Sequence, residues 1–148
     1  MRRPLDVSGV GAERELALSS PRSGACGPRA LQLAARALGK NGSLVQLSRA
    51  AHATAAGTSL AGLRTAAESL GLRARGVQLD REALAQLRTP AVAWWQGNHF
   101  VAVLTVQESA WDAAQTATIH DPNEKEARTV PLDTLLAQSG GILLVLMR

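Results

Sequence analysis

The pattern of apolar and polar residues divides the chain into a helical first part and a strand-rich second part. The run over 28–38 is rich in strong helix formers, carries Pro28 in the first turn, where proline is tolerated, and is followed by Gly39. This run predicts a helix. Two further short helices, each with a serine N-cap, are predicted over 43–51 and 59–70.

Beyond Leu72 the period changes from that of a helix to that of a strand. Residues 74–79 alternate in character, and one or two helical turns are predicted over 81–87. Strands are predicted over 91–95, 99–106, 116–120 and 142–147, with a helix over 132–138. Helices first and antiparallel strands later predict an α+β fold.

The 148 residues fit one globular domain. Residues 1–24 contain several glycines and prolines with little periodicity, which predicts an N-terminal arm. The compact domain is therefore predicted over 25–148. The first residues lack the apolar core of an export signal, and the longest apolar run, Ile142–Met147, is too short for a membrane helix, so we expect a soluble protein.

The formal charge of +4 is concentrated near the N-terminus, since residues 1–50 hold eight Lys/Arg against three Asp/Glu. The basic residues are scattered, so the charge does not predict a nucleic-acid partner. One alternative reads residues 43–70 as a DNA-binding helix-turn-helix. Its second helix offers only Arg64, Thr65 and Glu68 as polar contacts, which argues against this reading.

Cys26 is the one cysteine of the chain, so it cannot form an intramolecular disulfide. It stands directly before Gly27-Pro28 and the predicted helix, where unpaired N–H groups and the helix dipole favour a thiolate. A nucleophilic cysteine requires this environment. The alternative is a small buried side chain, the usual state of a free cysteine.

A candidate base and a carboxylate flank two predicted strands. His99 begins one strand and Asp121 follows the other, at equal distances from residue 110 in the polar stretch between them. If these strands pair as a hairpin, Asp121 falls beside His99 and can orient the imidazole. Alternatively, His99 is a core or capping histidine, and Asp121-Pro122 is a plain turn.

Several short motifs occur in a fixed order along the chain. They are Cys26-Gly27-Pro28-x-Ala30-Leu31, Gly57-Thr58-Ser59-Leu60, Asn98-His99-Phe100-Val101-Ala102-Val103 and Ile119-His120-Asp121-Pro122. In this order they resemble the bacteriocin-processing cysteine peptidases, which cut peptides after a double-glycine leader. The resemblance runs from about Cys26 to Leu144.

The resemblance implies a papain-like cysteine peptidase fold in which Cys26 is the nucleophile, His99 the general base and Asp121 the third catalytic member. It implies no cofactor and no metal. The expected partners are a peptide or protein substrate with a double-glycine leader and a membrane exporter, which would place the chain in the cytoplasm or, through that partner, at the inner face of the membrane.

The sequence departs from the family at one position. The family usually has a glutamine six residues before the cysteine to bind the oxyanion, and Ser20 stands there instead. Ser20 is therefore a candidate for oxyanion support, and losing one such donor costs ~10²–10³ in rate. The alternative function is a weak or silent papain-like module that binds leader peptides.

Overall fold

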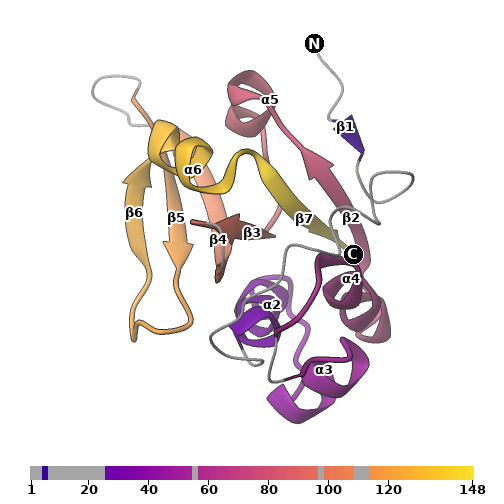
Figure 1. The fold of residues 1–148 in the computed structure, drawn as a ribbon. Helices are drawn as coiled ribbons and strands as arrows, with labels where there is room; N and C mark the ends of the chain where they lie inside the picture. Colours follow the sequence, from indigo (N-terminus) through magenta and orange to yellow (C-terminus); the bar gives the residue numbers. More distant parts are fainter. Residues whose placement is uncertain (1–4, 7–25, 55–56, 97–98, 109–113) are drawn as a thin grey trace.

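The computed structural model describes residues 5–6, 26–54, 57–96, 99–108 and 114–148. Its described elements are β1 (Leu5–Asp6), α2 (Cys26–Arg36), α3 (Leu44–Ala50), α4 (Leu60–Ser69), β2 (Arg73–Gln78), α5 (Arg81–Ala85), β3 (Ala91–Trp95), β4 (His99–Glu108), β5 (Gln115–His120), β6 (Arg128–Pro131), α6 (Leu132–Ser139) and β7 (Ile142–Met147). Figure 1 shows their arrangement. The predicted α+β fold is confirmed.

The predicted helix boundaries agree closely with the structure. Ser43 caps α3 by accepting from the Gln46 N–H in a complete capping box, and Ser59 caps α4 by accepting from the Gly62 N–H. The first long helix begins at Cys26, two residues before the predicted start. None of the helices in the described ranges combines the length and the apolar character that crossing a membrane takes.

A single antiparallel sheet organises the fold, in the strand order β1-β2-β7-β3-β4-β5-β6. Two of these strands were not predicted. β6 is a short edge strand whose residues are mostly exposed, so it lacks the apolar alternation that reveals a strand. β1 lies inside the predicted N-terminal arm and pairs with β2, while residues 7–25 of that arm lie outside the described residues.

Helices cover both faces of the sheet, as Figure 1 shows, with α2, α3 and α4 on one face and α5 and α6 on the other. Each face has its own core of buried side chains. β3 and β4 contribute to both cores: Trp94 and Phe100 belong to the first core, and Trp95 and Val101 to the second. All five residues of β3 are therefore buried, which explains its continuous apolar sequence.

The two glycines that join α6 to β7 provide a matched test of packing. Both have positive φ, 63° at Gly140 and 77° at Gly141. A Cβ at Gly140 would meet nothing within 4 Å, whereas a Cβ at Gly141 would lie 2.1 Å from the Leu79 carbonyl oxygen. That segment of backbone is fixed by the Leu79 N–H, which donates to the Gly141 oxygen at 2.9 Å.

We expect Gly140→Ala to lower the free energy of unfolding by about 1 kcal/mol, the cost of a left-handed alanine. Gly141→Ala adds a backbone clash and is expected to cost about 3 kcal/mol or more. Urea unfolding followed by circular dichroism measures both. Equal losses in the two variants would contradict the close approach of Gly141 to the Leu79 carbonyl oxygen.

Candidate active site

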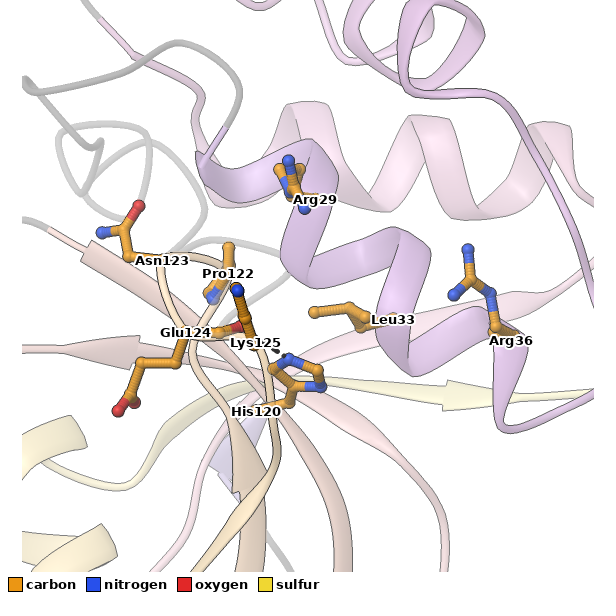
Figure 2. Close-up of a pocket in the computed structure, with 8 residues that line it drawn as sticks. All are labelled: Arg29, Leu33, Arg36, His120, Pro122, Asn123, Glu124 and Lys125. Carbon is orange, nitrogen blue, oxygen red and sulfur yellow. Dashed lines mark hydrogen bonds between the residues drawn. The ribbon is translucent and has the colours of Figure 1, made fainter.

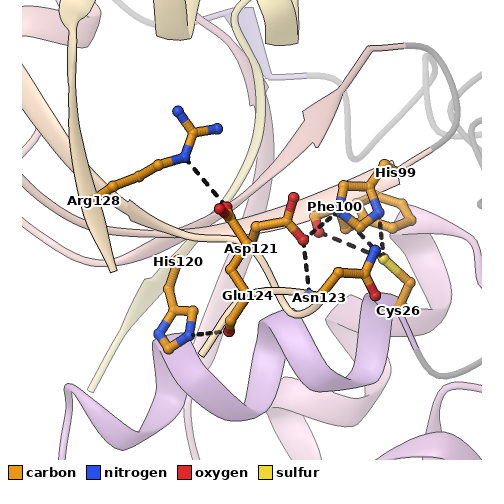
Figure 3. Close-up of polar contacts among 8 residues, drawn as sticks. All are labelled: Cys26, His99, Phe100, His120, Asp121, Asn123, Glu124 and Arg128. Atoms are coloured by element: carbon orange, nitrogen blue, oxygen red, sulfur yellow. Dashed lines mark hydrogen bonds and ion pairs between the residues drawn. The ribbon is translucent and has the colours of Figure 1, made fainter. Parts of the chain in front are cut away.

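Three side chains from separate elements meet at one end of the sheet (Figure 3). Cys26 is the first residue of α2, His99 the first residue of β4, and Asp121 directly follows β5. The Cys26 Sγ lies 2.7 Å from His99 Nδ1, and His99 Nε2 lies 2.8 Å from Asp121 Oδ1. The three residues singled out in the sequence are thus joined in one line of hydrogen bonds.

Cys26 is held by the packing of the α2 N-terminus against the loop before α4. A Cβ on Gly27 would lie 3.2 Å from the Thr58 Cβ and 3.3 Å from the methyl groups of Leu63, so glycine allows this close approach. Thr58 is itself buried. The Gly57-Thr58-Ser59-Leu60 motif is therefore more than an entry to α4, because it also supports the turn that carries the sulfur.

His99 is placed by a hairpin whose first strand is fully buried. It pairs with Trp95 across β3 and β4. Gln96, which follows Trp95, adopts a positive φ of 48° and donates its N–H to the Gln138 carbonyl oxygen at 2.9 Å, which ties the hairpin to α6. Only 14% of the His99 side chain is exposed. The imidazole is therefore fixed at the start of β4, where it is largely shielded from solvent.

The predicted register of the β4–β5 hairpin was wrong, although the predicted contact was correct. His120 pairs with Ala102, and the register shifts between Val103 and Thr105. Asp121 is therefore not directly opposite His99. It reaches the imidazole along a diagonal, a geometry in which side chains of neighbouring strands still interact. A bulge in β4 could not be read from the sequence.

Asp121 also forms the turn that was considered as its alternative role. Its Oδ1 accepts the Asn123 N–H at 2.8 Å, and its carbonyl oxygen accepts the Glu124 N–H at 2.9 Å. An aspartate that bonds the N–H two residues on is typical of Asp-Pro turns. The turn orients the carboxylate toward His99, so the two interpretations describe one arrangement.

The hydrogen bonds determine the protonation of His99. A carboxylate oxygen only accepts, so His99 Nε2 carries a proton and donates it to Asp121. The hydrogen bond with Cys26 raises the pKa of His99 from 6.5 to about 9, with further support from the hydrogen bond to Asp121 and the charges of both partners, while burial opposes the shift. His99 is therefore largely an imidazolium at neutral pH, and an imidazolium beside sulfur stabilises a thiolate.

Other candidate residues take different positions. His120 donates through Nε2 to the Glu124 carbonyl oxygen at 3.0 Å and does not join the Cys26–His99–Asp121 line. Trp94 and Trp95 are both buried, and the Trp94 ring meets Phe100 edge to face at 5.0 Å. Ser20 lies outside the described residues. Within those residues, no three His, Cys, Asp or Glu side chains are grouped to hold a metal ion.

One further contact of the sulfur could not be predicted from residue types. The Phe100 carbonyl oxygen lies 3.6 Å from Cys26 Sγ, at the distance of a weak thiol hydrogen bond. This contact involves the backbone next to His99, so no side-chain motif reveals it. It places the sulfur beside the first residues of β4.

A thiol at a helix N-terminus, an imidazole and a carboxylate are the groups that a cysteine hydrolase uses. Comparison with known proteins agrees. The family model described as the peptidase C39 family matches residues 19–148, and this chain belongs to that family of cysteine peptidases. Its predicted membership is confirmed.

Individual relatives carry related descriptions. The chain is 33% identical over 97 residues to the colicin V secretion/processing ATP-binding protein CvaB of Escherichia coli. The matched region covers 66% of this chain but 13% of that protein. The first curated relatives are therefore much longer proteins, of which this chain spans a small part.

Solved structures match over more of their length. A double-glycine-motif protease from an AMS/PCAT transporter, solved with its leader peptide, is 25% identical, with a TM-score of 0.69 over 82% of this chain and 83% of that one. The peptidase domain of Streptococcus ComA, a bifunctional ABC transporter, is 22% identical and has a TM-score of 0.70 over 87% and 96%. The second likeness supports the fold, which is that of these peptidase domains.

Proposed function

We propose that the chain is a cysteine peptidase domain that cleaves a peptide bond after a Gly-Gly pair, with Cys26 as nucleophile, His99 as acid and base, and Asp121 as the residue that orients His99. The observation that carries this proposal is the unbroken line from Cys26 Sγ through the imidazole to Asp121 Oδ1, with both distances below 3 Å. A buried packing cysteine does not need this line.

The geometry supports a two-step reaction. The Cys26 thiolate attacks the carbonyl carbon, the carbon–nitrogen bond breaks, and His99 gives the proton on Nδ1 to the leaving amine. Water then attacks the thioester and yields a proton to His99 as the thiolate leaves. Asp121 keeps Nε2 protonated throughout, so Nδ1, which faces the sulfur, is the nitrogen that exchanges the proton.

Oxyanion stabilisation is proposed to come first from the α2 N-terminus. The first N–H groups of a helix have no partner within the helix, and Cys26 is the first residue of α2. Ser20 remains the candidate for a second donor, in the position where the family usually has glutamine. A serine reaches less far than a glutamine, so we expect slower turnover than a glutamine at this position would give.

The relatives support a proposal for the substrate and the partner. The matched transporter protease was solved with its leader peptide, and CvaB is described as a secretion and processing protein. We therefore propose a peptide substrate with a double-glycine leader and, as a partner, a membrane exporter that would hold this domain at the inner face of the membrane. Residues 25–148 would form the peptidase domain and residues 1–24 an arm.

The test is cleavage of a peptide in which a leader segment ending in Gly-Gly is followed by several further residues, mapped by mass spectrometry. We expect cleavage directly after the second glycine. A matched peptide with both glycines replaced by alanine should lose about tenfold or more in kcat/KM, since added methyl groups must fit beside the thiolate. Binding of the leader without cleavage of either peptide would contradict the proposal and favour a silent binding module.

A further inference from the structure

A cavity lies between α2 and the turn that follows Asp121 (Figure 2). Its volume is about 320 Å³. Its lining includes Arg29, Leu33, Arg36, His120, Pro122 and Lys125. Its main feature is an excess of positive charge.

Two of its cations lie on one face of α2. Arg29, Leu33 and Arg36 are spaced by four and three residues, which brings their side chains to the same side of a helix. Lys125 adds a third cation from the opposite wall. Within the described part of the chain, none of these three cations forms an ion pair.

The acidic residue of the lining does not neutralise them. Glu124 binds Arg128 through Oε1 at 3.2 Å. Figure 2 shows its carboxylate directed away from α2, while the His120 ring is on the side of Leu33. Three cations thus surround a cavity whose floor includes Leu33 and the buried Pro122. Clustered cations without a counter-charge favour an anionic ligand.

We propose that this cavity binds an anionic group, a carboxylate or a phosphate, through Arg29, Arg36 and Lys125. Guanidinium groups form paired, charge-assisted hydrogen bonds with both anions. The anion could belong to an acidic side chain of a bound peptide or to a free phosphate compound. The first source rests on the proposed function, and the second does not.

The cavity shares its walls with the candidate active site. α2 begins with Cys26 and continues to Arg29 and Arg36. The opposite wall continues from Asp121, which the Asn123 and Glu124 N–H groups hold in place. An anion that bridges the two walls joins the element that carries the sulfur to the turn that carries the carboxylate. Occupancy of the cavity by an anion is therefore expected to affect the cleavage of a peptide as well as its binding.

The first experiment measures binding of inorganic phosphate to the Cys26→Ala protein by calorimetry and NMR at constant ionic strength. We expect saturable binding that an Arg29→Gln/Arg36→Gln variant weakens by about tenfold or more. The control is Arg49→Gln, which removes an exposed arginine from α3. Equal weakening by the control would overturn the proposal, because net charge alone would then explain the effect.

The second experiment separates the two sources of the anion. The KM of an acidic leader peptide is compared with that of a peptide whose glutamates are replaced by glutamine, in wild type and in the double arginine variant. A KM that rises only for the acidic peptide in the variant supports a peptide carboxylate. Phosphate binding without this difference supports a free anion. The absence of both the KM difference and phosphate binding would overturn the proposal.

These outcomes are separate from the fate of the peptidase proposal. A protein that cleaves no peptide but binds phosphate, and loses that binding with Arg29 and Arg36, retains the anion site and contradicts only the catalytic role. Far-ultraviolet circular dichroism and the thermal midpoint test whether the double variant is folded. We expect it to be folded, because both arginines are exposed.

Discussion

Replacing Cys26 by alanine is expected to lower kcat for a Gly-Gly peptide by about 10⁴-fold or more, and His99→Ala is expected to have an effect of similar size. The reason is that the two side chains act as one unit. The sulfur and Nδ1 lie 2.7 Å apart, so each proton transfer of the reaction involves both. The double variant should therefore be no slower than either single variant.

Steady-state and single-turnover kinetics on the three variants measure this non-additivity. His52→Ala is the matched control, because His52 is exposed and lies in the segment after α3, outside the site. It should keep wild-type kinetics. Losses that multiply in the double variant would show that Cys26 and His99 act independently, which would contradict the proposed dyad.

Replacing Asp121 by asparagine is expected to change the pH dependence as well as the rate. His99 has a pKa of about 9, and the hydrogen bond and charge of Asp121 contribute to raising it. Loss of that charge lowers the pKa of His99. Because His99 must be protonated to donate to the leaving amine, kcat/KM falls as the pH rises through this pKa. The alkaline limb, near pH 9 in wild type, should move to lower pH in the variant.

The size of the rate loss follows from the turn that holds residue 121. Asp121 Oδ1 accepts from both His99 and the Asn123 N–H, so an asparagine can keep its carbonyl oxygen in that position. The tautomer of His99 then survives, and we expect kcat/KM to fall by only about 10- to 100-fold near neutral pH.

Asp133→Asn removes a carboxylate that binds Arg81 at the surface, on α6, and serves as the control. This variant should leave the alkaline limb at its wild-type pH. An alkaline limb that stays in place in Asp121→Asn would show that Asp121 does not influence the protonation of His99.

Local signals in the sequence were sufficient for most of the elements. The capping serines, Ser43 and Ser59, predicted the two short helices, and the apolar run over 91–95 predicted the strand β3. These signals depend on neighbouring residues alone. The edge strand β6 was missed because it pairs with β5 through backbone hydrogen bonds, while its side chains are mostly exposed and show no apolar alternation.

The candidate site shows where local signals stop. Cys26 and His99 are 73 residues apart, and no periodicity reports their contact. The contact of His99 with Asp121 was predicted from a hairpin with a regular register. The observed register differs, and the contact survives because an aspartate in a turn can reach diagonally across two strands. The basic cavity was not predicted, because Arg29 and Lys125 come together only in the folded chain.

The rate at which iodoacetamide alkylates the protein at pH 7 tests the central claim most directly. The chain has one cysteine, so the rate reports on Cys26 alone. The Cys26–His99 pair predicts alkylation that is faster in wild type than in His99→Ala by about tenfold or more, because the imidazolium that stabilises the thiolate is lost. Equal rates in the two proteins would contradict the pairing and with it the assignment of Cys26 as the nucleophile.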